Sequence, residues 1–401
     1  MWGPGVAKAR LNPFLLLCGT GLFAIFSSTI AKSPALPLFA RDLGASEADI
    51  GFIAAASTVV GILVSLPAGT LSDLLGRRRV ILAAAFVFAS APFLYLTVQA
   101  PWMLVAVRVY HGLATAIFGP VALALVADLF EQGRGQSMGW YSSATLVGRF
   151  LAPLVGGLIL SVATYQAVYL VCGAAGVLAL AWRLPEGQRP KDGKPLAVTL
   201  AEQRSGLAEV VRSRPILVTS AAEALQYFSY GAVETFLPLY AVTVGGLPVW
   251  QVGFILGAQL LTTALSKPLM GRTSDRAGRR PLIALGLLTS GGATAAFGLG
   301  ASFPILLLAG LAYGLGLAVV TSSTSAFVSE QARAGSYGTA LGVLSTIMDV
   351  GHASGPIAAG LLIAAFSYAP TFVAVGALLG LATIAFLTLV PAQSESAASR
   401  A

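Results

Sequence analysis

Charged residues are scarce in this chain of 401 residues, because Asp, Glu, Lys and Arg together supply only 10 % of it while hydrophobic residues supply 56 %. A soluble domain keeps roughly a quarter of its residues charged. The mean hydropathy of +0.83 is correspondingly high. Such a composition cannot cover a fold with polar surface, so a water-soluble protein is excluded and lipid is the expected solvent.

Cysteine and histidine are also rare. The two cysteines, Cys18 and Cys172, lie in apolar segments, and there are only two histidines. This excludes a disulfide framework and makes a metal site improbable on composition. The chain has no G-x-x-x-x-G-K-[ST] stretch to hold ATP phosphates, and no paired catalytic carboxylates or nucleophile with a base. We therefore expect no cofactor, no metal and no enzymatic activity.

Long apolar runs fill most of the chain. A helix needs ~20 residues to cross ~30 Å of hydrocarbon, and twelve segments qualify. They are residues 13–39, 50–72, 80–98, 101–127, 136–160, 165–183, 215–241, 250–271, 281–300, 303–328, 337–363 and 368–390. Lys8 and Arg10 precede the first run as in a secretory signal, but the run exceeds a signal core. We expect a retained first helix.

Basic residues are distributed unevenly between these runs. If both termini are cytoplasmic, 19 of the 24 Lys and Arg fall on the cytoplasmic side, and only Arg41 falls on the other. This is the asymmetry of the positive-inside rule. It predicts a multi-pass protein of the plasma membrane, in bacteria the inner membrane, surrounded by lipid. The net charge of +8 is explained by this topology, and no nucleic-acid partner is expected.

The sequence repeats itself at half its length. GTLSDLLGRRRV begins at Gly69 and GRTSDRAGRRPL at Gly271, 202 residues later, and LPLF recurs as LPLY after 201 residues. Gly148, Ala152, Pro153 and Gly157 recur after 203 residues as Gly351, Gly355, Pro356 and Gly360. The repeat predicts an all-α membrane protein of two pseudo-symmetric six-helix halves, residues 1–183 and 215–401, joined by a cytoplasmic linker at 184–214. Its small residues four apart predict close helix contacts.

Several motifs resemble those of the major facilitator superfamily. GTLSDLLGRRRV resembles the family's loop between helices 2 and 3, and LVAVRVYHGLATA its helix 4 motif around an intramembrane arginine, here Arg108. GRFLAPLVGG resembles the helix 5 motif of antiporters, in particular the twelve-helix drug:proton antiporters, with Ala152 in place of a glycine and Arg149 as an added charge. The resemblance implies a monomeric secondary transporter that moves a small-molecule substrate by alternating access.

Charges at the helix ends form a second group of candidates. The resemblance implies that they latch the halves together on the cytoplasmic side and release during inward opening. These residues are Gly69, Asp73, Arg77, Asp128, Asp275, Arg279 and Glu330. The alternative is that they only set topology. Asp128 is the expected partner of Arg77, and Glu330 that of Arg279.

Ionisable residues inside the spans are costly and therefore need a role. The candidates for substrate binding are Lys32, Arg108, His111, Arg149, Glu234, Asp349 and His352. Alternatives are a gate pair of Lys32 and Glu234, a structural pair of Arg149 and Asp349, and simple packing of His111. Lys267, four residues before the second charged loop, is interpreted as an anchor that reaches the membrane surface.

The first span contains no acidic residue, although many drug:proton antiporters carry one there. Protons, the expected coupling ion, must then bind Glu223, Glu234 or Asp349, the carboxylates well inside the spans. Glu223 is favoured because no intramembrane cation lies close to it in sequence. The sequence thus favours proton-coupled efflux of drugs or metabolites, with an organic-anion symporter or exchanger using Lys32 and Arg149 as the alternative. A non-transporting membrane protein is the third possibility.

Overall fold

The computed structural model describes residues 12–130, 134–181, 198, 201, 213–331 and 337–390, and the longer of these stretches are almost entirely helical. The helices of the first half are α1 Pro13–Lys32, α2 Ala35–Asp42, α3 Glu47–Leu75, α4 Arg77–Tyr95, α5 Pro101–Leu129, α6 Arg134–Val162 and α7 Tyr165–Ala181. Those of the second are α9 Arg214–Thr243, α10 Val249–Ala277, α11 Arg279–Phe297, α12 Phe303–Gln331, α13 Tyr337–Phe366 and α14 Tyr368–Leu389.

Twelve membrane-spanning helices result, because α1 and α2 together make one span. The predicted first span is interrupted at Ser33 and Pro34, since proline has no N–H to continue the helical hydrogen bonds. Within the described residues, nine spans meet a strict test of length and hydropathy, and α7 is a shorter apolar helix. The polar side chains of α9 and the arginines and glycines of α11 lower their hydropathy, yet both helices lie within the bundle.

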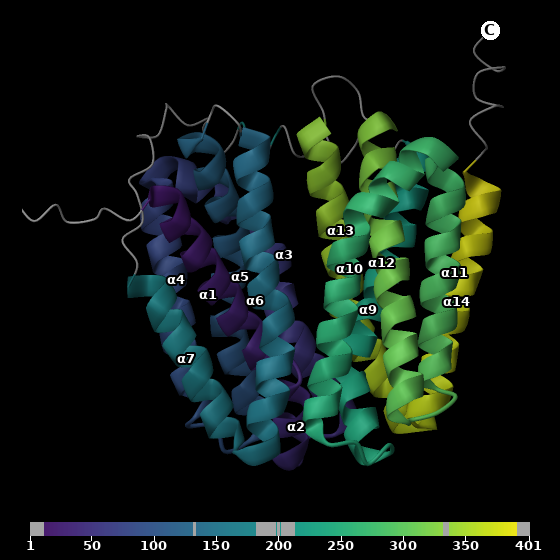
Figure 1. The fold of residues 1–401 in the computed structure, drawn as a ribbon, viewed down its shortest axis with the longest axis horizontal. Coiled ribbons are helices and arrows are strands. Elements are labelled where there is room, and N and C mark those ends of the chain that lie inside the picture. The colour runs from purple at the N-terminus through teal and green to yellow at the C-terminus, as the bar shows by residue number, and fades with distance from the viewer. Residues whose placement is uncertain are drawn as a thin grey trace, which may run out of the picture.

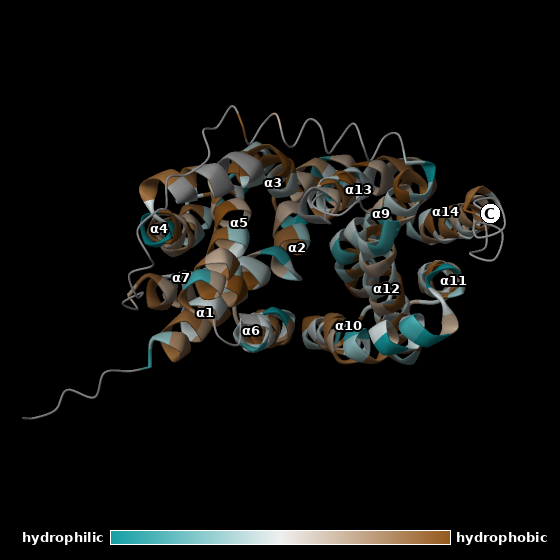
Figure 2. Ribbon diagram, turned by 90° about the horizontal axis from the view of Figure 1, so that it is seen from above, coloured by the Kyte–Doolittle hydropathy of each residue, from teal (hydrophilic) through white to brown (hydrophobic). Residues whose placement is uncertain are grey.

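The helices form two groups, α1–α7 and α9–α14, which stand side by side (Figure 1). We call the side on which α1 begins and α14 ends the termini side, at the top of the figure, and the other the opposite side. The ribbons of the two groups converge toward the opposite side. Seen from above, α6 lies beside α10 and α3 beside α13 (Figure 2). The predicted linker lies largely outside the described residues, so its bounds remain a prediction.

Two glycines shape the repeated loops. Gly76 separates α3 from α4 and Gly278 separates α10 from α11, with φ of 92° and 90°. A residue with a side chain rarely adopts this conformation. The N–H of each glycine donates to a buried serine carbonyl one turn earlier, that of Ser72 or Ser274. The glycines therefore allow one helix to end and the next to begin without an intervening loop.

A seam of small residues joins the two halves on the opposite side. A Cβ added at Gly253 of α10 would lie 2.3 Å from the Pro153 carbonyl oxygen of α6. The repeat-related contact is equally tight, since a Cβ at Gly51 of α3 would lie 2.4 Å from the Pro356 carbonyl oxygen of α13. Two hydrogen bonds extend the seam, from the Trp250 N–H to Ser161 Oγ at 3.0 Å and from Tyr368 OH to a Glu47 oxygen at 3.4 Å.

The other face of the same helices packs within each half. A Cβ at Gly148 of α6 would lie 2.4 Å from the Leu22 carbonyl oxygen of α1. Cβ atoms at Gly351 and Gly355 of α13 would lie 2.0 Å from carbonyl oxygens of α9, those of Ala224 and Phe228. The close helix contacts predicted from the repeated small residues are confirmed.

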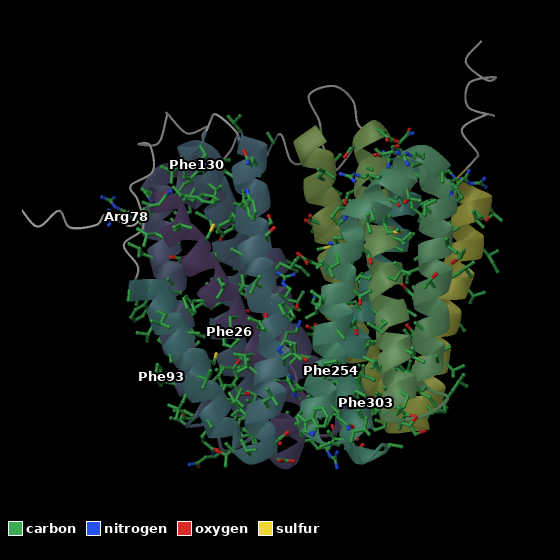
Figure 3. The ribbon with its side chains drawn as sticks, viewed as in Figure 1. Phe26, Arg78, Phe93, Phe130, Phe254 and Phe303 are labelled. Atoms are coloured by element: carbon green, nitrogen blue, oxygen red, sulfur yellow. The ribbon has the colours of Figure 1, made fainter. Side chains whose placement is uncertain are left out.

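Large apolar side chains cover the outer surface of the bundle. Leu63, Leu308 and Leu381 are each more than 60 % exposed, as suits a surface that contacts lipid. Aromatic side chains occur at both ends of the bundle. Phe130 lies on the termini side, and Phe254 and Phe303, whose ring centroids are 6.2 Å apart, lie on the opposite side (Figure 3).

Candidate functional site

A charged cluster links the two halves next to the seam, on its termini side. Lys32 Nζ, at the end of α1, lies 2.6 Å from Glu234 Oε2 of α9, and His352 Nε2 of α13 lies 3.1 Å from the same oxygen. The ammonium and the imidazole are 3.4 Å apart, and Tyr230 OH donates to the other Glu234 oxygen at 3.4 Å. The structure therefore brings three predicted substrate-binding residues together and confirms the contact between Lys32 and Glu234.

Arg108 and His111 lie inside the first half. Arg108 is 4 % exposed and donates to the Ser57 hydroxyl of α3. His111 is 1 % exposed, its ring meets Phe88 edge-on, and its Nδ1 lies 3.5 Å from Tyr95 OH. Its Nε2 has no partner among the described residues. These surroundings favour the packing role for His111.

Glu223 lines a polar pocket of about 260 Å³ in the second half. Its carboxylate is 3 % exposed and accepts a hydrogen bond of 2.5 Å from the Thr324 hydroxyl of α12. No ion pair of Glu223 occurs within 4 Å among the described residues. We define the polar pocket by its lining: Glu223, Tyr227, Lys267, Thr321, Ser325, Leu341, Leu344, Ser345 and Met348.

Arg149 and Asp349 remain without an ion pair in the described part of the chain. Arg149 is exposed on α6. Asp349 of α13 is half-buried. The described structure thus contains no Arg149–Asp349 pair, which was the structural alternative.

Ion pairs on the termini side occur at repeat-related positions in the two halves. Arg77 Nε donates to Asp128 and, through Nη1, to the Ser72 hydroxyl at 3.3 Å. Arg279 donates to Glu330 Oε1 from Nε at 3.0 Å and from Nη2 at 2.8 Å.

Both predicted partners of these arginines are confirmed. Arg279 also pairs with Asp275, so each of these described pairs lies within one half. Gly69 and Asp73 belong to α3, but their surroundings lie outside the described part of the structure.

Sequence reasoning missed Lys267 and Tyr227 as members of the site. The interpretation of Lys267 as an anchor stays a prediction. The residue is exposed and lies four residues before the charged motif at the end of α10, and its side chain also lines the polar pocket. Nothing in the sequence singles out Tyr227.

Two six-helix halves with a charged cluster between them define a two-halved membrane transporter. The sequence profile described as the Major Facilitator Superfamily matches residues 16–258 and 246–401. The chain belongs to this family of transporters, whose members bind small-molecule substrates and are not enzymes.

Relatives and solved structures agree with this assignment. The uncharacterized MFS-type transporter MJ1560 of Methanocaldococcus jannaschii is 22 % identical over 356 residues, 88 % of this chain and 89 % of that protein. The quinolone resistance protein NorA of Staphylococcus aureus is 28 % identical over 169 residues, 42 % of this chain and 41 % of NorA. A point variant of the nucleoside transporter NupG shares the fold, with a TM-score of 0.84, 14 % identity and coverage of 95 % and 100 %.

Proposed function

We propose that this transporter exports small organic solutes, drugs or metabolites, across a bacterial inner membrane in exchange for protons. The observation that carries the proposal is Glu223, a carboxylate that is buried on the polar pocket with a hydroxyl and no cation bonded to it. A proton carrier must gain and lose its proton as access alternates, and a carboxylate locked in an ion pair does this poorly. The similarity to NorA supports the export direction.

The other two candidate carboxylates are less suited to this role. Glu234 Oε2 is held by Lys32 at 2.6 Å and by His352 at 3.1 Å. Asp349 has no ion pair among the described residues, but it lies outside the polar pocket. We assign Glu223 as the carrier and the Lys32–Glu234–His352 cluster as a contact that must open when the two halves separate on the opposite side.

The ion pairs on the termini side are consistent with a latch that holds this side closed in one state of the transport cycle and releases it in another. Each described pair lies within one half while the seam on the opposite side is closed. We propose that Asp73 and Asp275 contact the other half when the termini side closes. We further propose that both termini are cytoplasmic. The protein is then a monomer surrounded by lipid.

Glu223→Gln in proteoliposomes tests proton coupling. The variant keeps the shape and a hydrogen-bonding group for Thr324 but cannot carry a proton. We expect it to lose transport driven by an imposed pH gradient and to retain energy-independent exchange of solute. Asp349→Asn is the matched control and should retain gradient-driven transport. If Glu223→Gln still concentrates solute against a gradient, the carrier lies elsewhere or the protein is no proton antiporter.

Organic-anion transport is the second candidate, and Arg149 favours it, because this residue is exposed and has no ion pair among the described residues. Lys32, the other cation of that hypothesis, is already paired with Glu234. An anion site that depended on Lys32 would have to break this contact.

A further inference from the structure

A small cavity lies between the two halves, beside the charged cluster of Lys32, Glu234 and His352. Its volume is about 10 Å³, which is the room that one water molecule needs. Residues of α1, α6, α9 and α10 line it, and α6 lies beside α10 in Figure 2. We call this space the interface cavity and define it by its lining: Thr29, Ser33, Pro153, Tyr230, Glu234, Leu256, Gln259 and Leu260.

Two polar atoms of this lining have no hydrogen-bond partner among the described residues. They are Ser33 Oγ, at the break between α1 and α2, and Gln259 Oε1 of α10. Ser33 is 4 % exposed and Gln259 is 2 % exposed, so both atoms are shielded from bulk solvent. A buried polar atom without a partner destabilises the native state, and in native proteins an ordered water or ion commonly satisfies it.

Glu234 supplies a third polar group to the same lining. Its Oε2 is held by the other two members of the charged cluster, but its Oε1 accepts only one long bond, of 3.4 Å, from Tyr230 OH. A carboxylate oxygen has room for a further hydrogen bond. One water molecule can donate to Glu234 Oε1 and Gln259 Oε1 and accept from the Ser33 hydroxyl, which satisfies all three groups.

The helices around the interface cavity cannot close it by moving nearer to one another. On one side α10 already touches α6, because a Cβ at Gly253 would lie 2.3 Å from the Pro153 carbonyl oxygen. On the other side α6 touches α1, because a Cβ at Gly156 would lie 3.2 Å from Ile30 Cγ1. The backbone contacts therefore fix the size of the cavity, and only a ligand can satisfy its polar atoms.

We propose that the interface cavity binds a single water molecule that joins Ser33 of the first half to Glu234 and Gln259 of the second. This inference goes beyond the proposed function, because it adds a ligand to the charged cluster whichever solute or coupling ion is transported. Ser33 and Gln259 become positioning residues of the contact that opens on the opposite side. The water gives them in the closed state the hydrogen bonds that bulk solvent gives them when the halves separate.

A sodium ion is the other occupant of this size, since the polar groups of the lining all offer oxygen atoms. The charge of the site argues against it. The one carboxylate of the lining, Glu234, is already paired with the Lys32 ammonium at 2.6 Å. A second cation here would face that ammonium without a further anion to offset the repulsion. A neutral ligand avoids this cost.

Ser33→Ala and Gln259→Leu test the bridge through the sign of their effect on thermal unfolding of the full chain in lipid nanodiscs. If one water bonds to both residues, each variant loses hydrogen bonds and should lower the midpoint by about 2–4 °C. The double variant should fall by less than the sum, because both single variants disturb the same water. In a dry cavity each variant removes an unpaired polar group and raises the midpoint. A rise in either variant, or additive losses, would overturn the inference.

Ser323→Ala is the matched control. Ser323 Oγ also has no partner among the described residues and the residue is 0 % exposed, but it lines neither the interface cavity nor the polar pocket. This variant should raise the midpoint or leave it unchanged. A fall as large as that of Ser33→Ala would attribute both losses to packing and count against the water.

Radiolytic footprinting with X-rays detects the water in the unaltered protein, because hydroxyl radicals formed from a bound water modify the side chains next to it. Leu256 of the lining is 4 % exposed and Leu317 of α12, outside it, is 5 % exposed. Leu256 should be modified several times faster than Leu317, and Gln259→Leu should remove this difference. Equal rates in the parent protein would contradict a bound water. A difference that persists in Gln259→Leu would assign the labelling to bulk solvent and contradict it too.

Unfolding in NaCl and in choline chloride distinguishes water from a sodium ion. We expect the same midpoint in both salts. A saturable rise with NaCl that Gln259→Leu abolishes would show a bound cation and overturn the inference, because a ligand of the native state raises the midpoint. These measurements do not depend on Glu223→Gln, so the bound water and proton coupling can each fail without the other.

Discussion

The two halves share a backbone plan but differ in their polar groups. Arg77 reaches Asp128 across 51 residues of sequence, and Arg279 reaches Glu330 across the same 51. Lys32 and Glu234 also occupy repeat-related positions, 202 residues apart, yet their charges are opposite and they bind each other. The ion pairs at the helix ends and the glycine seam are thus duplicated, whereas the charged residues at the interface between the halves have diverged.

This difference has a physical cause. Close helix packing and short helix connections are required in both halves, so glycines recur at Gly51 and Gly253 and at Gly76 and Gly278. An ion pair between repeat-related positions requires unlike charges. Lys267 has Ser65 at the related position 202 residues earlier, so the polar pocket also belongs to one half only.

The largest expected effect on transport comes from breaking the shared seam. Gly253→Leu and Gly51→Leu place atoms where a Cβ would already lie 2.3 Å and 2.4 Å from a carbonyl oxygen of the other half. Overpacking of about 1–3 kcal/mol should lower transport in proteoliposomes by about 10- to 100-fold. Gly292→Leu is the control, because Gly292 is exposed and has nothing within 4 Å. Different effects at the two seam glycines would contradict their equivalence.

Exchanging the charges of Lys32 and Glu234 tests whether this ion pair joins the two halves. Lys32→Glu alone or Glu234→Lys alone places like charges together, and each should destabilise the protein by on the order of 3 kcal/mol. The double exchange should recover much of this loss, as measured by denaturant unfolding in nanodiscs. Recovery will be incomplete because His352 Nε2 also bonds to the Glu234 carboxylate, which the exchange replaces by an ammonium. If the double variant is as unstable as the sum of the single variants, the pair does not join the halves.

Substitutions of the latch residues should reduce the rate of transport more than the stability of the protein. Arg77→Ala and Arg279→Ala remove partly exposed ion pairs, which contribute about 0–1 kcal/mol. We expect reduced transport with expression and solute binding largely intact, and the same for Asp73→Asn. Turnover assays beside binding assays measure the two effects. Full turnover in any of these variants would remove that residue from the latch.

The smallest effect is expected at His111. Its Nε2 is unbonded among the described residues and its contact with Tyr95 OH is long, at 3.5 Å. His111→Phe therefore loses little hydrogen bonding and keeps the aromatic packing against Phe88. Solute affinity should change by less than about twofold, since this weak bond is the one polar contact of His111 among the described residues. A large loss of affinity would return His111 to the substrate site.

The sequence by itself determined the membrane class, the twelve spans, the duplication and the partners of Arg77 and Arg279. The membrane class and the spans depend on composition, and the duplication is visible as a repeat in the sequence. The partners of the two arginines follow from short connections, such as that at Gly76, which place neighbouring helix ends together. It also indicated close packing along α6 and α13, because glycines four apart occupy one face of a helix.

Only the tertiary structure decided which intramembrane charges meet. Lys32 binds Glu234 and His352 because α1, α9 and α13 converge at the interface between the halves, and sequence spacing does not encode distances between helices of different halves. The depth of a charge in the membrane, and the groups left to pair with it, follow from helix length and packing.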